Sequence, residues 1–570
     1  MKYPEIEDEN FNELITKKLK PYYIKKTKKT MKQLCQPKKF KLQNSQKLVA
    51  EFLHPKSPYH SLLVFHQIGS GKTCTAITVA EQWKKKKKIL ILTPASLIDN
   101  MRDELRTKCG QGNYITDKES NELAKLKVSD KKYQAIIKKS NLRIAKFYNI
   151  MSYHKFVKLA LENKISLKNT LLIIDEVQNM VSESGTFYRV LYQKIKKAPT
   201  DLRIMLLSAT PMFDRPQEIG LTLNLLRPKE EFPIGNAFVE TYLKKYKTKN
   251  GFKYRPTNLK DFKGKVKGLI SYYRGADPIS YPEANFKLKR ITMEDFQYKS
   301  YLGALSDTDG YIRGAFKSED ILNLPTNFLI GPRVVSNIAF PNKCTGVEGM
   351  KCFRGKCLEL QNLKNYSIKF FHILKSLKKS EGPCFVYSNF KTYGGVDCFI
   401  RVLKKHGWKD FKQHGEGKRR FAIWSGEETI EYKSLVKSTF NQSKNFDGSK
   451  LHLVLGSPSI KEGVTLKRLD QMHILEPYWN LSRMLQIIGR GVRYCSHADL
   501  PKRRRKVNIF LYIAKTQDDR ESVDEYIWKL AKQKAKLIDK FERIMKEHAI
   551  DCETFYNANY DKENPLQCFY

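Results

Sequence analysis

The chain has 570 residues, of which 41% are hydrophobic, so several folded domains are expected and wholesale disorder is excluded. Lys and Arg number 105 against 59 Asp and Glu, and the resulting net charge of +46 favours polyanionic partners, nucleic acid first and anionic membranes second. The absence of a long apolar run, the acidic opening MKYPEIEDEN and eleven scattered cysteines predict a soluble protein of a reducing, intracellular compartment without a membrane partner.

The N-terminal region changes the sign of its charge abruptly. The first 13 residues carry five acids, whereas residues 14–40 hold ten lysines and no acid, with Tyr22, Tyr23 and Phe40 among them. This pattern predicts a basic N-terminal arm over residues 1–40. The arm either contacts phosphate groups or is a solvated, partly helical lead-in, and both interpretations stay open at this point.

Short apolar segments alternate with helical patterns from about residue 41. The expected strands are SLLVFH at 61–66, ILILT at 89–93, and FYNIM, LLIID and IMLLS, which end at Met151, Asp175 and Ser208. Helices are expected over 73–83 and from Ser96 to about residue 107. Apolar strands separated by helices indicate a parallel sheet covered on both faces, so residues 41–228 are predicted to form one α/β domain.

The rest of the chain divides into three further regions. Residues 229–365 lose the alternation and are predicted to be an insert or linker. Apolar strands return at 384–388, 420–424, 451–455 and 471–475, which predicts a second α/β domain over 366–515. Residues 516–570 form a helical tail whose apolar face carries Trp528, Leu530, Ile538 and Phe541. That face either packs on the second core or docks a partner.

A phosphate-binding loop is predicted between the first strand and its helix. The sequence HQIGSGKT places glycines where backbone N–H groups must approach phosphate oxygens, at the positive end of a helix dipole. His66 stands where the motif usually has its outer glycine. The residues expected to bind the nucleotide are Gly69, Ser70, Gly71, Lys72 and Thr73, with the Thr73 hydroxyl as a ligand of Mg²⁺.

A carboxylate pair is predicted at the end of a neighbouring strand. In LLIIDEVQ, Asp175 is expected to hold Mg²⁺ and Glu176 to polarise the attacking water. The pair could instead cap a helix, but its position about 100 residues after Lys72 in the same α/β domain favours a catalytic role. The segment Ser208-Ala209-Thr210 follows the next strand.

These segments resemble the motifs of superfamily two helicases and translocases. GSGKT, DEVQ and SAT resemble motifs I, II and III, and Thr93-Pro94 resembles motif Ia. FVYSNF (385–390), KEGVTL (461–466) and QIIGRGVR (486–493) resemble motifs IV, V and VI. Gln46 is similar to the upstream glutamine that reads adenine, with Gln43 as the rival, and the resemblance implies that Gly463 of motif V also contacts the nucleotide.

The resemblance implies a fold and a mechanism. The fold is two tandem RecA-like parallel-sheet domains with an insert and a helical C-terminal tail, and ATP binds in the cleft between the domains. Arg490 and Arg493 lie near one helical face and would reach the γ-phosphoryl group as arginine fingers, the alternative being ordinary surface arginines. Gln178 belongs to the catalytic set, although many relatives carry His there, and this difference bears on how hydrolysis is coupled to motion.

The details resemble helicase-related proteins of nucleocytoplasmic large DNA viruses, such as the poxvirus nucleoside triphosphate phosphohydrolase I and the small subunit of the early transcription factor. The segments that carry this resemblance are PYHSLLVFHQIGSGKTCTAI, KGLISYYRG, GRGVRYCSHADLP, SVDEYIWKLAKQK and AIDCETFYN. It implies a nucleic-acid-dependent ATPase of viral transcription, in the virion or the cytoplasmic viral factory.

Several alternatives stay open within this resemblance. DNA is favoured over RNA, and the protein partner would be viral RNA polymerase or a second transcription factor subunit. The chain would translocate on nucleic acid or unwind it, or it would be a promoter-binding factor subunit whose ATPase drives complex release without unwinding. A scaffold with a degenerate ATPase is disfavoured by the complete set of Lys72, Glu176 and Arg490.

Weaker signals concern cysteines and lysine runs. Cys344, Cys352 and Cys357 could be three zinc ligands, with His372, Cys384 or a more remote residue as the fourth, or they form a reduced loop cluster. The segment Cys495-Ser496-His497 could suggest a nucleophile pair but is expected to give structural support to Arg493. The run 84–88 is expected to be a solvated turn, and the run 502–506 a phosphate contact or a localisation signal.

Overall fold

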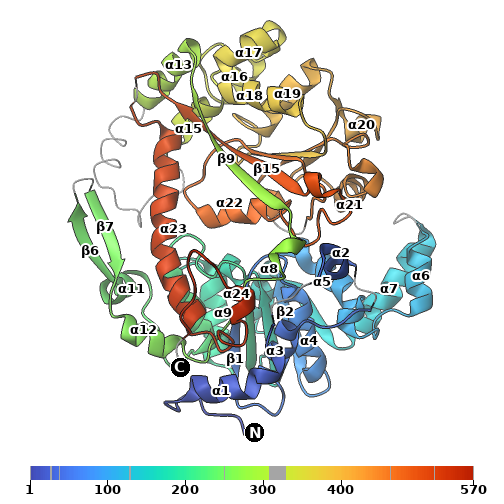
Figure 1. Cartoon of the computed structure of the whole chain (residues 1–570), viewed down its shortest axis with the longest axis vertical. Helices are drawn as coiled ribbons and strands as arrows, with labels where there is room; N and C mark the ends of the chain where they lie inside the picture. Colours follow the sequence, from blue (N-terminus) through green and yellow to red (C-terminus); the bar gives the residue numbers. More distant parts are fainter. Residues whose placement is uncertain are drawn as a thin grey trace. The chain divides into compact units, whose positions relative to one another are not determined.

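The chain forms two compact units in the computed structural model, which describes residues 2–25, 29–36, 39–126, 130–248, 251–306, 329–461, 464–518 and 520–568 (Figure 1). Unit 1 comprises Met1–Lys244, Tyr254–Asp277 and Leu537–Tyr570. Unit 2 comprises Lys245–Lys253 and Pro278–Lys536. Unit 1 is therefore assembled from segments at both ends of the chain.

Unit 1 is built on a six-stranded parallel sheet in the order β3-β2-β4-β5-β1-β8. The strands are β1 (Ser61–His66), β2 (Lys88–Thr93), β3 (Tyr148–Ser152), β4 (Thr170–Asp175), β5 (Arg203–Ser208) and β8 (Ile270–Tyr273). The five strands expected from their apolar runs are confirmed. The sixth, β8, comes from the region expected to be an insert and forms the edge beside β1.

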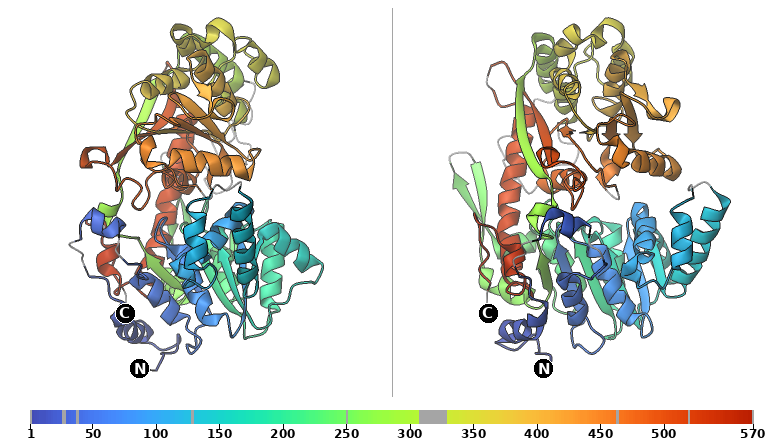
Figure 2. Two further views of the ribbon diagram at one scale, coloured as in Figure 1. Left: turned by 90° about the vertical axis from the view of Figure 1, so that its right-hand side faces the viewer. Right: turned by 45° about the vertical axis from the view of Figure 1, so that its right-hand side comes forward.

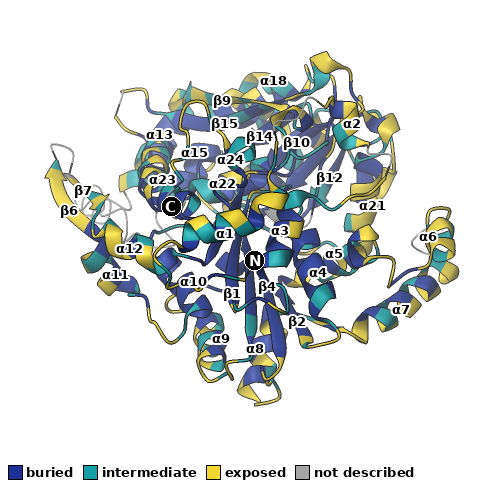
Figure 3. Ribbon diagram, turned by 60° about the horizontal axis from the view of Figure 1, so that its bottom comes forward, coloured by how far each residue is buried: buried dark blue, intermediate teal, exposed yellow. Residues whose placement is uncertain are grey.

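Helices flank this sheet on both sides in the two views of Figure 2. They are α1 (Phe11–Leu19), α2 (Met31–Cys35), α3 (Asn44–Phe52), α4 (Lys72–Trp83), α5 (Ile98–Leu105), α6 (Asp117–Leu123), α7 (Lys131–Ala145), α8 (Tyr153–Leu161), α9 (Thr186–Lys196), α10 (Glu218–Leu226), α11 (Gly235–Tyr242), α12 (Leu259–Val266) and α24 (Tyr556–Asn559). Side chains along each strand alternate between the two faces of the sheet. Leu62 and Val64 of β1 therefore belong to the core that includes residues of α3 and α4. Figure 3 shows β1 and β4 buried and α6 and α7 widely exposed.

The segment expected to be a basic arm contains a packed helix. Phe11, Ile15 and Leu19 lie on one face of α1 at helical spacing and are fully buried in the core of unit 1. The hydroxyl of Tyr59 also donates to the carbonyl of Pro4 at 2.8 Å. The lysines between these apolar residues hold their charged ends in solvent. Because composition counts these charges and not the spacing of the apolar residues, it suggests a free arm.

Unit 2 has a seven-stranded parallel sheet in the order β11-β12-β13-β10-β14-β15-β9. Its strands are β9 (Glu283–Thr292), β10 (Cys384–Tyr387), β11 (Lys409–Asp410), β12 (Arg420–Trp424), β13 (Leu453–Gly456), β14 (Gln471–Ile474) and β15 (Lys506–Lys515). Two cores cover its faces: Cys384 and Val386 belong to one, and Phe385 and Tyr387 to the other. The expected parallel α/β class is confirmed for both units.

The helices of unit 2 come from the second part of the region without alternation and from the segment that follows it. They are α13 (Asp295–Ser306), α15 (Ile330–Asn337), α16 (Val347–Cys352), α17 (Leu360–Tyr366), α18 (Ile368–Leu377), α19 (Val396–Lys405), α20 (Phe411–His414), α21 (Ile430–Phe440) and α22 (Leu481–Ile488). A separate two-stranded sheet pairs β6 (Leu243–Thr248) with β7 (Gly251–Pro256).

The tail contains one long helix, α23 (Val523–Glu547), which begins in unit 2 and ends in unit 1. In unit 2, Val523 and Ile527 are buried in a hydrophobic cluster, and the ring of Trp528 stacks on Phe286. In unit 1, the ring of Phe541 lies 5.2 Å from that of Phe262. The apolar stripe expected from the sequence is therefore divided between two cores.

Disulfides join pairs of cysteines within unit 1. Cys74 is bonded to Cys109 and Cys552 to Cys568, at sequence separations of 35 and 16. The expectation of reduced cysteines is wrong for these pairs, because such separations carry no local signal and the sulfur atoms meet only through the fold.

Candidate active site

The loop that follows β1 has the geometry of a phosphate cradle. Gly69 and Gly71 adopt φ angles of 81° and 83°, in the left-handed region that glycine enters without steric cost. A Cβ atom on Gly71 would lie 2.8 Å from Nε2 of Gln46, so this position also needs glycine for close approach. The hydroxyl of Ser70 is buried and has no hydrogen-bond partner among the described residues. The loop therefore offers backbone and side-chain donors at the start of α4.

Two side chains expected to bind nucleotide lie against this loop. The ammonium group of Lys72 donates to the carbonyls of His66 at 2.9 Å and Gln67 at 3.3 Å. Gln46 is buried in α3, and its Oε1 accepts from the backbone N–H of Gln43 at 2.9 Å. The close approach of the Gln46 amide to Gly71 favours Gln46 over Gln43 as the residue beside the nucleotide.

Asp175 ends β4 and Glu176 follows it, at the same edge of the sheet. β5 lies between β4 and β1, and all three strands are parallel, so Asp175 and the phosphate loop both follow strand carboxyl ends. Glu176 adopts a φ of 52°, which is unusual for a residue with a side chain. The hydroxyl of Tyr153 donates to the carbonyls of both Asp175 and Glu176 and holds this turn.

Gln178 joins the carboxylate motif to the Ser-Ala-Thr segment. Its Nε2 donates to Oε2 of Glu176 at 2.6 Å, and its Oε1 accepts from the hydroxyl of Ser208 at 2.7 Å. The Ser208 hydroxyl oxygen in turn accepts from the backbone N–H of Thr210 at 2.9 Å. An amide suits this position because it donates on one side and accepts on the other.

Two further residues of unit 1 shape the same edge. Thr93 ends β2, fully buried, and its hydroxyl has no hydrogen-bond partner among the described residues. Glu218, which no sequence motif indicates, accepts from the backbone N–H groups of Phe213 at 2.6 Å and Asp214 at 3.0 Å. Burial raises the pKa of Glu218 to about 7. Its only signal in the sequence is an acid in the first turn of α10.

The arginines of motif VI lie in unit 2, in the turn after α22. The expectation that they share a helical face is wrong, because the helix ends at Ile488, ahead of Gly489 and Gly491. The side chain of Arg490 is buried and its Nε donates to the carbonyl of Gln486 at 3.2 Å. Arg493 accepts from the backbone N–H of Ser496 through its carbonyl at 3.1 Å. Gly463 of motif V lies outside the described residues.

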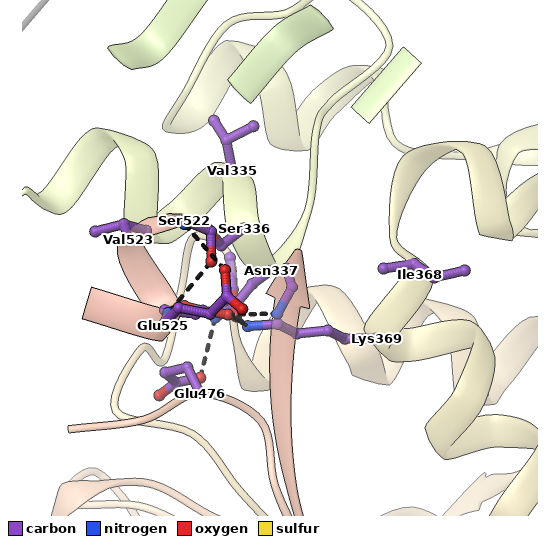
Figure 4. Close-up of polar contacts among 12 residues, drawn as sticks. Val335, Ser336, Asn337, Ile368, Lys369, Glu476, Ser522, Val523 and Glu525 are labelled. Carbon is purple, nitrogen blue, oxygen red and sulfur yellow. Dashed lines mark hydrogen bonds and ion pairs between the residues drawn. The ribbon is translucent and has the colours of Figure 1, made fainter. Parts of the chain in front are cut away.

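A buried polar network lies behind motif IV in unit 2 (Figure 4). Glu476 follows β14 and accepts from the Ser388 hydroxyl at 3.0 Å and from Asn337 Nδ2 at 3.0 Å. Lys369 donates to Asn337 Oδ1 at 2.8 Å and pairs with Asp524 at 2.6 Å. Burial raises the pKa of Glu476. This network ties the start of α23 to the segment after β10.

The three cysteines that could have held zinc do not form a metal site in the described structure. Cys344, Cys352 and Cys357 are free, and they are not among the side chains that come together within metal-binding distance. Cys384, one proposed fourth ligand, is buried in strand β10, where burial raises the pKa of its thiol. The described group with suitable spacing is Cys74, Glu104 and Cys109, whose two cysteines form a disulfide.

The weaker sequence signals have structural explanations. Ser496 and His497 are buried, and their side chains contact each other at 2.8 Å while His497 Nε2 lies 2.9 Å from the carbonyl of Leu469. They support the turn that carries Arg493, as expected. In the lysine run after α4, Lys84 pairs with Glu81 and Lys87 donates to the carbonyl of Asp201 at 2.6 Å.

Two family models and several relatives match the sequence of this chain. A sequence model of the DEAD/DEAH box helicases matches residues 44–219, and a model described as nucleoside triphosphatase I C-terminal matches residues 497–567. A protein of Acanthamoeba polyphaga mimivirus, named as an ATP-dependent RNA helicase, is 46% identical over 571 residues and is aligned over 99% of its length with 100% of this chain.

More distant relatives carry helicase or termination-factor names. A helicase of Invertebrate iridescent virus 3 is 28% identical over 90% of this chain and 53% of its own length. The termination factor NPH-I homolog of African swine fever virus is 24% identical over 86% of this chain and 76% of its own length. The helicase domain of Pyrococcus furiosus Hef aligns with 85% of this chain and 97% of its own, at 13% identity and a TM-score of 0.41. Among the described helices, none is both long and apolar enough to cross a bilayer.

Proposed function

Since the chain belongs to the DEAD/DEAH box helicases that carry a nucleoside triphosphatase I C-terminal segment, and is therefore an ATP hydrolase, we propose that nucleic acid stimulates its ATPase and that it acts in viral transcription. One observation carries the enzymatic part. The phosphate loop, the Asp175-Glu176 pair and the Ser208–Thr210 segment meet at one sheet edge, and Gln178 bridges the last two.

The residues of unit 1 fit MgATP. The left-handed loop, with its buried free hydroxyl, leaves room that a Cβ on Gly71 would fill, and Lys72 is the cation for the β- and γ-phosphates. Thr73 and Asp175 supply the hard oxygen ligands that Mg²⁺ prefers. Bound Mg²⁺ would neutralise charge on the transferred phosphoryl group. Glu176 would orient the attacking water, and Gln46 would hold the adenine.

Unit 2 carries the residues proposed as arginine fingers and as the motif V contact with the nucleotide. Arg490 and Arg493 would stabilise the charge of the transferred γ-phosphoryl group, and Gly463 would contact the nucleotide. The support for these roles is their place in motifs VI and V of the family. The guanidinium of Arg490 is held by the Gln486 carbonyl, which limits the entropy lost when it acts.

Gln178 is proposed to couple hydrolysis to motion. Its amide contacts Glu176, which would orient the water, and Ser208, which holds the loop of Thr210. A change at the γ-phosphate that moves Glu176 would therefore reach the hydrogen bonds of the Ser-Ala-Thr segment through Gln178 alone. The replacement of the usual His by Gln keeps one donor and one acceptor in this position.

The partner is proposed to be nucleic acid, with DNA favoured over RNA, and the setting the virion or the viral factory in the cytoplasm. The net charge of +46 and the names of the relatives support a polyanionic partner. The termination-factor name of one relative supports transcript release, with viral RNA polymerase or a second factor subunit as protein partner. The alternative is a promoter-binding subunit that releases complexes without unwinding.

The test is steady-state ATPase of the full chain, alone and with single-stranded DNA, duplex DNA or RNA. DNA should stimulate turnover most, because DNA is the partner proposed. Lys72→Ala should abolish basal and stimulated turnover but retain DNA binding, while Lys47→Ala, an exposed lysine on α3, should match the unchanged protein. A strand-displacement assay then separates unwinding from release. Turnover that no nucleic acid raises would overturn the proposal.

A further inference from the structure

The C-terminal segment covers the open edge of the unit 1 sheet. β8 pairs with β1 on one side, and residues 550–559 satisfy its backbone on the other. The N–H of Ile550 donates to the carbonyl of Ile270 at 2.9 Å. Asn559 donates to the carbonyl of Tyr272 at 3.1 Å and accepts from the N–H of Arg274 at 2.8 Å. Side chains thus replace a seventh strand at an edge that would otherwise carry unpaired groups.

One contact of this segment continues into the sheet. Asp551 accepts from the N–H of Tyr272 at 2.8 Å through Oδ1 and from the hydroxyl of Ser271 through Oδ2. The Ser271 hydroxyl lies 2.8 Å from Nε2 of His66. Asp551, Ser271 and His66 are each 0% exposed. A continuous hydrogen-bonded chain therefore runs from the C-terminal segment across β8 to the last residue of β1.

The order of this chain excludes a nucleophilic triad. A serine nucleophile needs histidine as its base with the carboxylate behind the histidine, whereas here the serine lies between the other two. Burial also closes the Ser271 hydroxyl to any substrate. With Asp551 ionised, Ser271 donates to it and the Nε2–H of His66 donates to Ser271, while Nδ1 of His66 has no hydrogen-bond partner among the described residues.

His66 is the point where this chain reaches the nucleotide loop. It ends β1, and its carbonyl accepts from the Lys72 ammonium group at 2.9 Å. Its imidazole is held by Ser271 on one side and packs edge-on to Tyr273 with 5.7 Å between ring centres. The bond to Ser271 fixes the imidazole, and the pairing of β1 with β8 sets His66 opposite Tyr273, so the side chain and the backbone of His66 are both held by β8.

We propose that Asp551 is a positioning residue for ATP binding, holding His66 through Ser271 and so setting the start of the phosphate loop and the resting place of Lys72. The inference rests on the phosphate-binding role proposed for Lys72. Asp551 lies in the segment that the nucleoside triphosphatase I C-terminal model matches. This segment would therefore contribute to ATP binding in unit 1. The groups that carry out hydrolysis follow β4 and would be affected less.

The test compares two ways of weakening the same edge. Ser271→Ala and Asp551→Asn interrupt or alter the hydrogen-bonded chain to His66. Asn559→Ala instead removes the hydrogen bonds from the same segment to Tyr272 of β8 and to the following Arg274, and it leaves the chain to His66 intact. ATPase of the full chain is measured without nucleic acid, and thermal unfolding is recorded for each variant. We expect Ser271→Ala to raise the KM for ATP about three- to tenfold, the value of one hydrogen bond, with kcat changed less. Ser271→Thr keeps a hydroxyl and should restore the KM.

The KM for ATP and the unfolding temperature of these variants together decide whether Asp551 positions His66. Asn559→Ala should lower the unfolding temperature yet leave the KM unchanged, because a merely structural contact alters the folded fraction and not the folded site. An unchanged KM in folded Ser271→Ala, or an equal rise in Asn559→Ala, would overturn the positioning role. If Asp551→Asn does not fold, Ser271→Ala still decides, since it leaves the bond from Tyr272 to Asp551 in place. The readout needs no nucleic acid, so failure of stimulation by nucleic acid is a separate result.

Discussion

Two buried aspartates anchor the C-terminal segment, one in each unit, and they are stabilised by different physics. In unit 2, Asp524 at the start of α23 forms an ion pair with Lys369 at 2.6 Å, and both side chains are almost fully buried. In unit 1, Asp551 is held by two uncharged donors, the Ser271 hydroxyl and the Tyr272 N–H. The same residue type therefore serves once as half of a charge pair and once as an isolated carboxyl group.

The difference shows how a buried carboxyl group reacts to its surroundings. A nearby cation stabilises the ionised form of the carboxyl group. The pair is then costly to break, because either partner alone would be a buried ion without a counter-charge. Without a cation, the group avoids the cost of desolvation by holding its proton, and burial raises the pKa of Asp551 to about 7. The anchor of unit 2 should thus depend on charge balance, and that of unit 1 on pH.

Breaking the ion pair should give the largest effect on stability. Asp524→Asn leaves Lys369 buried with its amide contact to Asn337 but without its counter-charge. We expect unit 2 to lose about 3–5 kcal/mol of unfolding free energy, the usual cost of removing one partner of a buried pair. Chemical denaturation followed by tryptophan fluorescence measures the loss.

The double variant provides the control for the pair. Asp524→Asn combined with Lys369→Met removes both charges and should recover a large part of the loss, because no bare ion remains. Strict additivity of the two single losses would show that the pair is not coupled. It would then follow that the two anchors differ less than their contacts indicate.

A change of pH should distinguish Asp551 from His66, the two ends of the hydrogen-bonded chain in unit 1. The raised pKa of Asp551 contributes stability that is present below pH ~4 and is lost as pH rises through about 7. Burial, with the nearby Lys72 charge, lowers the pKa of His66 to about 3, so its contribution is present above pH ~6.5 and is lost as pH falls below that value. Between pH ~4 and ~6.5 the two slopes oppose each other.

Variants that change only one of the two residues should reveal the separate pH dependence of stability that each contributes. Asp551→Asn leaves His66, so the stability of unit 1 should rise with pH across this window, by up to about 1.4 kcal/mol per pH unit. His66→Gln leaves Asp551 and should give a slope of opposite sign. The groups that face this chain are Lys72, Tyr273 and the backbone N–H of Tyr272, and all are unchanged in both variants. Thermal unfolding measured at half-unit steps of pH checks the signs, and slopes of the same sign in both variants would contradict the opposition.

Much of this architecture is readable from the sequence, and the part that is not has a common cause. Strands such as β1 and β4 are buried on both faces, so their apolar runs stand out. β9 is a mostly exposed edge strand that carries Lys287 and Lys289, and its polar pattern gives no strand signal. β8 escapes prediction because only four residues form it.

The site divides in the same way. Lys72, Asp175 and Glu176 are recognisable because local motifs surround them. Ser271 and Asp551 are 280 positions apart, and no spacing rule connects a serine in a short edge strand to an aspartate in the tail. The helix α1 illustrates the opposite error, since ten lysines in residues 14–40 obscure the apolar stripe that starts at Phe11.

Salt should give the smallest effect, and it contrasts these buried anchors with exposed charge. Neither Asp524 nor Asp551 should respond to ionic strength, because buried pairs are screened little. The exposed lysines of the N-terminal segment should respond if they contact phosphate. Deleting residues 1–40 would not test this, since it also removes the buried Phe11 and its neighbours in the core.

The better test replaces exposed lysines and leaves the apolar residues in place. One variant changes Lys20, Lys25, Lys29 and Lys32 to Gln, and a control changes Lys131, Lys132, Lys138 and Lys139, the exposed lysines of α7. Both variants remove the same charge, so a general field effect would lower DNA affinity equally. If the N-terminal lysines bind phosphates, only the first variant should flatten the plot of log K against log salt, by about 0.7–0.9 for each phosphate that is no longer neutralised. Equal slopes for the two variants would show that this segment serves the fold through α1 and takes no direct part in binding.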